Sequence, residues 1–269
     1  MKLWATLLIG GWMLGTACAA ETQERPVIRV LLETLHHQSR LIPGRNFSQT
    51  IMAQVLKEQG AEVEESHRVL ARAEELTEAE FSAYDLVVMN GRYSGKRQPD
   101  VFSPEVLKAL DNYVISGGYL LVISGGSGLG AGVSPPFYNP LMSRYGVEVQ
   151  PGPGRTGPAP TPTLRDQEHP LVRDIEALYP CHGTTLKLTN REAVPLAFLD
   201  KEPCLAVVPR GFGWVIILGG GSGWMDQGMD PAISTNKGQT ERIEANQKLI
   251  RNLVDWLQLL KQSQMRGRP

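Results

Sequence analysis

The sequence predicts an α/β fold, a doubly wound and mostly parallel sheet of the flavodoxin-like three-layer type with added β-hairpins. Three short apolar runs, at 27–32, 84–89 and 119–123, predict buried strands, and helical patterns lie between them. This alternation of strand and helix is typical of a doubly wound sheet. Four further apolar runs are separated by turn residues, which predicts hairpins added to the parallel sheet. They cover residues 185–188, 194–199, 205–208 and 214–218.

The first helix is predicted by an apolar face that recurs at helical spacing. Gly60 follows this pattern and ends the helix, and a short strand is expected around Val63. Residues 71–81 then form a helix or a loop that leads into the strand at 84–89. The apolar face consists of Phe47, Ile51, Met52, Val55 and Leu56.

The helix that begins after Ser103 has the clearest local signals. Ser103 is a good N-cap residue, Pro104 fits the first turn, and Glu105 suits the positive end of the helix dipole. An apolar stripe follows, and Gly117-Gly118 ends the helix. A second amphipathic helix, from Ile243 to Leu257, is expected to close the domain. We expect the basic tail at 261–269 to be frayed.

Composition identifies a globular protein. The chain has 269 residues, 42% of them hydrophobic and 20% charged, which excludes coiled coils, collagen-like fibres and fully disordered proteins. Lys and Arg number 27 against 28 Asp and Glu, and no long run of like charge occurs. We therefore expect no nucleic-acid partner.

Residues 1–20 have the pattern of a secretory signal peptide. Lys2 precedes the apolar stretch Leu3–Leu14, and Ala17-Cys18-Ala19 supplies small residues for cleavage. The apolar stretch is shorter than the roughly 20 residues that span a bilayer. The sequence therefore predicts export, with the protein periplasmic or secreted. The remaining residues, 21–269, are predicted to form a single domain in which the Pro- and Gly-rich segment 151–163 is an excursion.

The three cysteines leave two questions open. Ala17-Cys18 also fits a lipoprotein signal, although Gly15 replaces the usual Leu, so the alternatives are removal of Cys18 or a lipid anchor on it. Lipidation of Cys18 is the one expected route to the membrane. Cys181 and Cys204 either pair as a disulfide or remain buried thiols. Neither has a second Cys or His at ligand spacing, so we expect no metal site there and no cofactor.

Polar residues follow the predicted strands where ligands gather in open α/β sheets, at the carboxyl ends. We expect a ligand-binding site there, although strand ends run into polar loops in proteins without a site as well. The candidate ligand-binding residues are Glu33, His36, Asn90, Arg92, Gly126, Ser127 and Asp226.

Ser127 and the histidines are the candidates for catalysis. Ser127 lies in a glycine-rich turn after a buried strand and resembles a nucleophile elbow, but Leu129 breaks the G-x-S-x-G pattern. A glycine-rich turn needs no catalysis to explain it. His36 or His37 could act as a base or, beside Glu33, bind a metal, whereas packing in a loop is the simpler interpretation.

The loop at 219–223 is rich in glycine but lacks the Lys-Ser/Thr of a phosphate-binding loop. Trp214 and Trp224 flank it. They could form an aromatic wall for a sugar, and core packing is the alternative, favoured for Trp214.

The order of elements resembles the class I glutamine amidotransferase-like superfamily. More narrowly, it is similar to an uncharacterised, non-catalytic branch in exported bacterial proteins, with ThuA-like domains as distant relatives. The stretches that carry the resemblance are 84–88, 107–122, 169–172 and 210–219. Together they cover most of the chain after residue 20, and the helix followed by Gly117-Gly118 and a strand is the most specific of them.

The sequence departs from the catalytic members of that superfamily. These use a Cys after the central strand and a later His-x-Glu pair, but here Ser124 and Ser127 occupy the turn and no His precedes Glu at that spacing. The resemblance therefore implies the fold and a ligand edge at the turn near Ser127, and glutaminase activity is not expected. Our leading hypothesis is a binding or assembly module of the bacterial envelope. Its partner would be a small molecule such as a sugar, or an envelope protein. The alternatives are a serine hydrolase that uses Ser127 with His36 or His37, and a metal-dependent carbohydrate-active enzyme with a site around Glu33 and His36.

Overall fold

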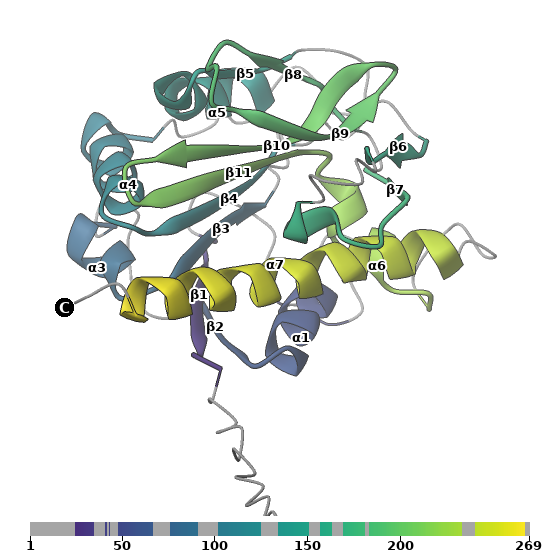
Figure 1. Ribbon diagram of the computed structural model, residues 1–269, viewed down its shortest axis with the longest axis horizontal. Helices are drawn as coiled ribbons and strands as arrows, with labels where there is room; N and C mark the ends of the chain where they lie inside the picture. The colour runs from purple at the N-terminus through teal and green to yellow at the C-terminus, as the bar shows by residue number, and fades with distance from the viewer. Residues whose placement is uncertain are drawn as a thin grey trace, which may run out of the picture.

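The computed structural model confirms a mixed α/β fold built on a seven-stranded sheet (Figure 1). It describes residues 25–34, 41, 43, 48–66, 76–90, 102–124, 134–150, 157–162, 169–180, 183–232 and 240–266. The strand order is β2-β1-β3-β4-β11-β10-β9. The first five strands in this order run parallel, and β10 and β9 are antiparallel additions.

The parallel strands are β1 (Ile28–Leu32), β2 (Ala61–Glu65), β3 (Leu86–Asn90), β4 (Tyr119–Ser124) and β11 (Gly213–Gly219). Three of them, β1, β3 and β4, arise from the apolar runs predicted above, and β2 lies where a short strand was expected around Val63. The run at 214–218 was expected only in an added hairpin, but as β11 it also pairs in parallel with β4. The added hairpins use β9 (Val194–Leu199) and β10 (Glu202–Arg210). Every residue of β3 and of β4 is buried, as expected for central strands with both faces covered.

Two apolar cores lie on opposite faces of the sheet because side chains alternate along each strand. Leu86 and Val88 belong to the core beneath α1 (Thr50–Glu58) and α7 (Thr240–Arg266). Val87 and Met89 belong to the core beneath three other helices. These are α3 (Glu78–Ser82), α4 (Pro104–Ile115) and α5 (Ser134–Met142). The molecule is therefore three-layered.

The predicted start of α4 is confirmed. The Ser103 hydroxyl accepts a hydrogen bond from the Val106 N–H at 3.3 Å, and Pro104 occupies the first helical position. Gly117 has a φ of +114°, which allows the chain to turn sharply after the helix.

Two expectations about the outer elements were wrong. The run at 185–188 forms β8 (Leu186–Leu188), which pairs with β5 (Val147–Val149) in a separate two-stranded sheet and does not join the main one. The tail after Lys261 is not frayed from its start. It continues α7 to Arg266, because Lys261 Nζ binds the Asp85 carboxylate at 2.8 Å and so holds the helix on the sheet.

The remaining elements are short. A second small sheet pairs β6 (Ala159–Pro160) with β7 (Ala177–Leu178), so the described part of the Pro- and Gly-rich excursion contributes one strand. The 3-10 helices are η2 (Ser143–Tyr145), η3 (Pro170–Val172) and η4 (Ser222–Trp224), and η4 leads into α6 (Asp226–Met229). Among the described helices, none has the length and apolar character that a bilayer crossing requires.

Cys204 is a free, buried thiol in β10, and burial raises its pKa to about 12. For this residue the structure agrees with the second alternative, a buried thiol. Cys181 lies outside the described residues.

Candidate functional site

The carboxyl ends of β1, β3, β4 and β11 lie at one edge of the sheet, as predicted. Asn90 pairs in register with Ile123, and Ser124 pairs with Gly219. Glu33 directly follows β1, and its N–H donates to the Val88 carbonyl of β3 at 2.9 Å. Five of the predicted residues, His36, His37, Arg92, Gly126 and Ser127, lie outside the described residues.

Glu33 is fully buried and belongs to a polar group between β1 and β2. The Ser66 hydroxyl lies 3.4 Å from Glu33 Oε1 and accepts the Thr34 N–H at 2.8 Å. No local pattern pointed to Ser66, because its role depends on the parallel pairing of β1 with β2. This serine fixes the main chain where β1 ends.

Asn90 and Trp224 meet above the end of β3. The Asn90 amide nitrogen donates to the Trp224 carbonyl at 3.1 Å, and both residues are fully buried. Asn90 Oδ1 and Trp224 Nε1 have no hydrogen-bond partner among the described residues. Because its ring lies in the core, Trp224 cannot form the exposed aromatic wall considered above. Trp214 is partly buried and packs edge-on against Trp256, as core packing predicts.

Two hydrogen bonds fix the main chain of Ser124 at the end of β4. Its carbonyl accepts hydrogen bonds from the Gly220 N–H and the Thr184 hydroxyl, both at 2.9 Å. Its hydroxyl is buried with no partner among the described residues. Since Asn90 pairs with Ile123, Ser124 faces the other side of the sheet from Asn90. A ligand that contacts both must therefore lie across the edge.

Close packing explains the glycines of the loop after β11. A Cβ at Gly219 would lie 2.1 Å from the Thr184 carbonyl oxygen, and one at Gly220 would lie 2.3 Å from Pro180 Cβ. These contacts account for Gly219 and Gly220 without phosphate binding.

Asp226 connects the same loop to α1. Its carboxylate accepts the Ile51 N–H at 2.8 Å, and its own N–H donates to the Ser48 carbonyl at 2.8 Å. Burial raises the pKa of Asp226, although hydrogen bonds from Ile51, Thr50 and Ser48 oppose this shift. Within the structure the carboxylate thus caps a helix, and its predicted contact with a ligand stays a prediction.

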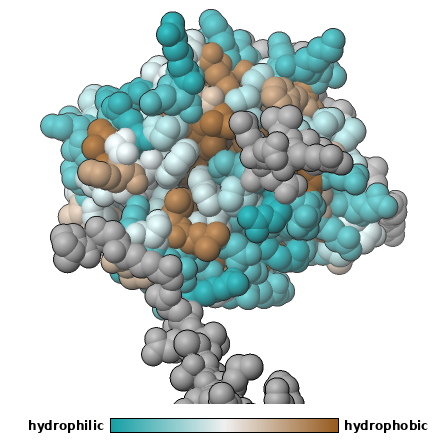
Figure 2. All heavy atoms as spheres, viewed as in Figure 1, coloured by the Kyte–Doolittle hydropathy of each residue, from teal (hydrophilic) through white to brown (hydrophobic). Residues whose placement is uncertain are grey.

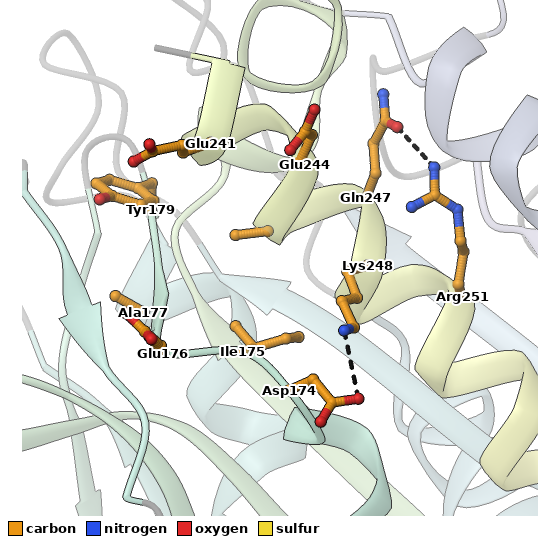
Figure 3. Close-up of a pocket in the computed structure, with 11 residues that line it drawn as sticks. Asp174, Ile175, Glu176, Ala177, Tyr179, Glu241, Glu244, Gln247, Lys248 and Arg251 are labelled. Atoms are coloured by element: carbon orange, nitrogen blue, oxygen red, sulfur yellow. Dashed lines mark hydrogen bonds and ion pairs between the residues drawn. The ribbon is translucent and has the colours of Figure 1, made fainter.

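A pocket of about 680 Å³ lies beside this edge, between the segment around β7 and the first half of α7 (Figure 3). It has four carboxylates and two cations in its wall. Lys248 is paired with Asp174 at 3.4 Å, and Arg251 donates to Gln247 at 2.9 Å. Of the predicted site residues that the structure describes, Glu33, Asn90 and Asp226, none lines it. The carboxylates in the wall are Asp174, Glu176, Glu241 and Glu244.

Asn246 connects this pocket to the strand-end edge. Its side chain binds the Tyr179 N–H and carbonyl, at 3.1 and 3.2 Å, and also donates to the Gly223 carbonyl at 3.0 Å. Tyr179 lines the pocket, and Gly223 belongs to η4 after β11. The sequence did not single out Asn246, because one amide in an amphipathic helix gives no sign of such a role.

The arrangement suits binding by neutral polar groups. In the described part of the chain no group of three or more His, Cys, Asp or Glu side chains could hold a metal ion. The buried polar atoms at the edge that have no partner among the described residues are an amide oxygen, a hydroxyl and an indole N–H, which together can accept and donate hydrogen bonds.

Comparison with protein-family models and with curated proteins finds no match. Solved structures do match. The cytoplasmic protein STM1381 of Salmonella typhimurium LT2 aligns with a TM-score of 0.59 and 16% identity over 86% of this chain and 99% of its own. A GMP synthase-like protein from Thermoplasma acidophilum gives 0.52 and 11% identity over 90% and 100% of the two chains. A ThuA-like protein from Bacteroides uniformis gives 0.50 and 9% over 89% and 94%.

The chain has a class I glutamine amidotransferase-like fold. The resemblance seen in the sequence is thus confirmed at the level of the fold. At these identities the likeness extends no further, and the amidotransferase-like fold by itself assigns no activity.

Proposed function

We propose that the protein is an exported envelope protein whose amidotransferase-like domain binds a hydroxyl-rich small molecule, such as a sugar, and does not hydrolyse glutamine. The ligand lies across the carboxyl edge of the sheet. The observation that carries this proposal is the set of buried polar atoms there without a partner among the described residues: Asn90 Oδ1, Ser124 Oγ and Trp224 Nε1.

Buried polar atoms are nearly always hydrogen-bonded, and each one left without a partner costs about 1–3 kcal/mol. Three such atoms lie close together, at the ends of β3 and β4 and in the loop after β11. A ligand that hydrogen-bonds to them would offset this free-energy cost. Sugar hydroxyl groups match all three atoms, since a hydroxyl both donates and accepts. An alternative partner, an envelope protein, would have to reach the same buried atoms with an inserted side chain.

The sequence supports the absence of glutaminase activity. The turn after β4 reads Ser124-Gly125-Gly126-Ser127-Gly128, with no Cys nucleophile, and the chain contains no His-x-Glu pair. Export is supported by the leader at 1–20.

Ser124→Ala tests the binding proposal. Removing a buried hydroxyl that has no partner among the described residues should raise the free energy of unfolding by about 1 kcal/mol, while it weakens binding. A thermal-shift screen with neutral monosaccharides and disaccharides supplies the ligand, and the shift should shrink in the variant. Ser116→Ala is the control, because Ser116 is exposed at the end of α4 and its loss should change neither quantity. A stability loss with Ser124→Ala, or an unchanged shift, would contradict the proposal.

Labelling with a fluorophosphonate probe distinguishes binding from hydrolysis. The proposal predicts that the folded protein does not label. Labelling that disappears in Ser127→Ala would instead support the serine hydrolase.

A further inference from the structure

The amino edge of the sheet, opposite the candidate ligand site, carries an exposed apolar tip flanked by arginines. Phe212 lies in the turn between β10 and β11 and is 79% exposed, the largest value among the exposed large apolar residues in the described part of the chain. Ile115, at the end of α4, is 38% exposed beside it. Apolar atoms gather where this turn meets α4, at the left of the view in Figure 2.

The turn that carries Phe212 is fixed to the end of α4. The Phe212 N–H donates to the Ile115 carbonyl at 3.0 Å, so the turn is fastened to the end of α4. Gly211 has a φ of +61°, and a Cβ there would lie 2.5 Å from the same carbonyl oxygen. An aromatic side chain held out from such a turn loses little conformational entropy when it is buried by a partner.

Two arginines flank the tip around one carboxylate. Arg210 makes a bidentate pair with Asp111, both contacts at 3.2 Å, and Arg144 lies 3.7 Å from the same carboxylate. Two cations thus face one anion. Both guanidinium side chains are more than a third exposed, at 40% and 38%, whereas the Asp111 side chain is 12% exposed. The surface therefore offers positive charge and free guanidinium N–H groups next to the apolar tip.

Both ends of the described chain come to this edge. Lys261 Nζ donates to the Val27 carbonyl at 3.0 Å, just before β1, and Gln264 Nε2 donates to the Tyr119 hydroxyl at 3.3 Å, at the start of β4. Figure 1 shows the β10–β11 turn and the end of α7 on the same side of the molecule. Ten residues separate Cys18 from Ile28, and they reach at most about 35 Å when extended. A lipid anchor on Cys18, one of the alternatives above, would therefore tether this edge of the protein close to the membrane.

We propose that this hairpin surface, formed by Ile115, Arg144, Arg210 and Phe212, docks onto an anionic lipid bilayer. Phe212 and Ile115 enter the headgroup region, and the two arginines bind lipid phosphates. An exposed aromatic beside arginines suits the boundary between headgroups and acyl chains, where one end of the site is apolar and the other charged. The inference rests on the proposed function only for the location of the protein in the envelope.

Hydrogen–deuterium exchange of the full chain, with and without vesicles, locates the contact. Vesicles of equal parts phosphatidylcholine and phosphatidylglycerol should slow exchange in the segments 112–118 and 209–214, and vesicles of phosphatidylcholine alone should do so less. The segment 194–199 should not change. Because the readout is local, binding through the leader cannot imitate it. Protection absent from both hairpin-surface segments would overturn the proposal.

Variants of the full chain give the second measurement. Phe212→Ser should lower vesicle partitioning at least about tenfold, the lower end of the range that corresponds to burial of a Phe side chain. Arg144→Gln should lower it about fivefold. Val194→Ser is the matched control, because Val194 is an apolar residue of β9 that is 45% exposed and is not one of the four residues of the hairpin surface. Equal losses for Phe212→Ser and Val194→Ser would contradict the assignment.

Sedimentation velocity without lipid tests the other occupant of such a surface. A monomer is expected. If the protein is a dimer and Phe212→Ser makes it dissociate into monomers, the surface binds a second copy of the chain. That result would overturn the lipid proposal. Failure of the sugar screen would leave these measurements unaffected, so the two proposals fail separately.

Discussion

At the scale of single residues, Asp226 shows how a side chain at the candidate site is also part of the framework. Its carboxylate accepts the Ile51 N–H at the start of α1, and its N–H binds the Ser48 carbonyl. The N-terminal N–H groups of a helix have no partner within the helix, so a carboxylate there stabilises it. Asp226 therefore positions the loop after β11 against α1, beside the edge where Asn90 meets Trp224.

Asp226→Asn should change how stability depends on pH. Since burial raises the pKa of Asp226 above its ordinary 3.8, the ionised form is less favourable in the folded protein than in the unfolded chain. The contribution of this group is complete below pH 3.8 and is lost as the pH rises through the folded pKa. Asn keeps an oxygen acceptor for Ile51 and does not titrate. The variant should therefore gain stability relative to the wild type as the pH rises above 3.8.

Urea unfolding at a series of pH values checks this expectation. Asp226→Ala is the comparison that removes the cap, and it should cost about 1 kcal/mol. A difference between the wild type and Asp226→Asn that stays constant with pH would show that the group is not perturbed by burial.

At the scale of elements, the packing of the β10–β11 hairpin on α4 depends on Gly213. A Cβ there would lie 2.1 Å from the Gly118 carbonyl oxygen and 2.3 Å from that of Val114. Both obstacles are backbone atoms and cannot rotate away. Gly213→Ala should therefore destabilise the protein by about 3 kcal/mol, the upper part of the range for overpacking.

Thermal or urea unfolding measures this loss. The neighbouring Phe212→Ala is the control, because its side chain is exposed and its removal should change stability by less than about 0.5 kcal/mol. Similar stabilities for the two variants would mean that the hairpin can move away from α4 at little cost.

Lys261 fixes the end of α7. Its ammonium binds both oxygens of Asp85 at 2.8 Å and the Val27 carbonyl at 3.0 Å, and both partners of the ion pair are partly buried, with side chains 30% and 21% exposed. Lys261→Met leaves the Asp85 carboxylate with its hydrogen bond from the Arg29 N–H. We expect a loss of about 1–2 kcal/mol, larger than for an exposed pair. Urea unfolding measures this loss and compares it with that of Lys248→Met. The ion-pair partner of Lys248 is Asp174, which is 70% exposed, so this variant should lose less than about 1 kcal/mol.

Local signals in the sequence predicted some elements and missed others for physical reasons. Ser103, Pro104 and Glu105 predicted the start of α4, because capping and dipole effects act within one turn. The helix α5 was not predicted: Pro140 lies inside it, and proline opposes helix formation there. The apolar run at 185–188 predicted a strand, but not its partner, since strand pairing depends on contacts distant in sequence.

The candidate site was predictable only as an edge. That Asn90 and Ser124 end neighbouring strands followed from the order of apolar runs and was confirmed. Three other features depend on the tertiary structure: the lack of a partner for Asn90 Oδ1 and Ser124 Oγ among the described residues, the Ser66 hydroxyl beside Glu33, and the hydrogen bonds from Asn246. The predictions for His36, Arg92, Gly126 and Ser127 stay predictions, as these positions lie outside the described residues.

At the scale of the whole molecule, the sheet separates two surfaces. The edge with Asn90 and Ser124 lies at the carboxyl ends of the parallel strands, and the hairpin surface with Phe212 lies at their amino ends. The strand β4 connects them and spans about 17 Å at the usual rise of a strand. A protein docked by its amino edge on a membrane would hold its carboxyl edge away from the bilayer, open to a soluble ligand.

This separation predicts that the two surfaces act independently. Sites more than about 10 Å apart without shared partners usually have additive effects, within about 0.5 kcal/mol. Phe212→Ser should leave the ligand-induced thermal shift unchanged, and Ser124→Ala should leave vesicle partitioning unchanged. In the double variant, the change in unfolding free energy should equal the sum of the single changes. A coupling well above this limit would mean that β4 transmits changes between its ends, because rigid packing along a fully buried strand offers the direct route between them.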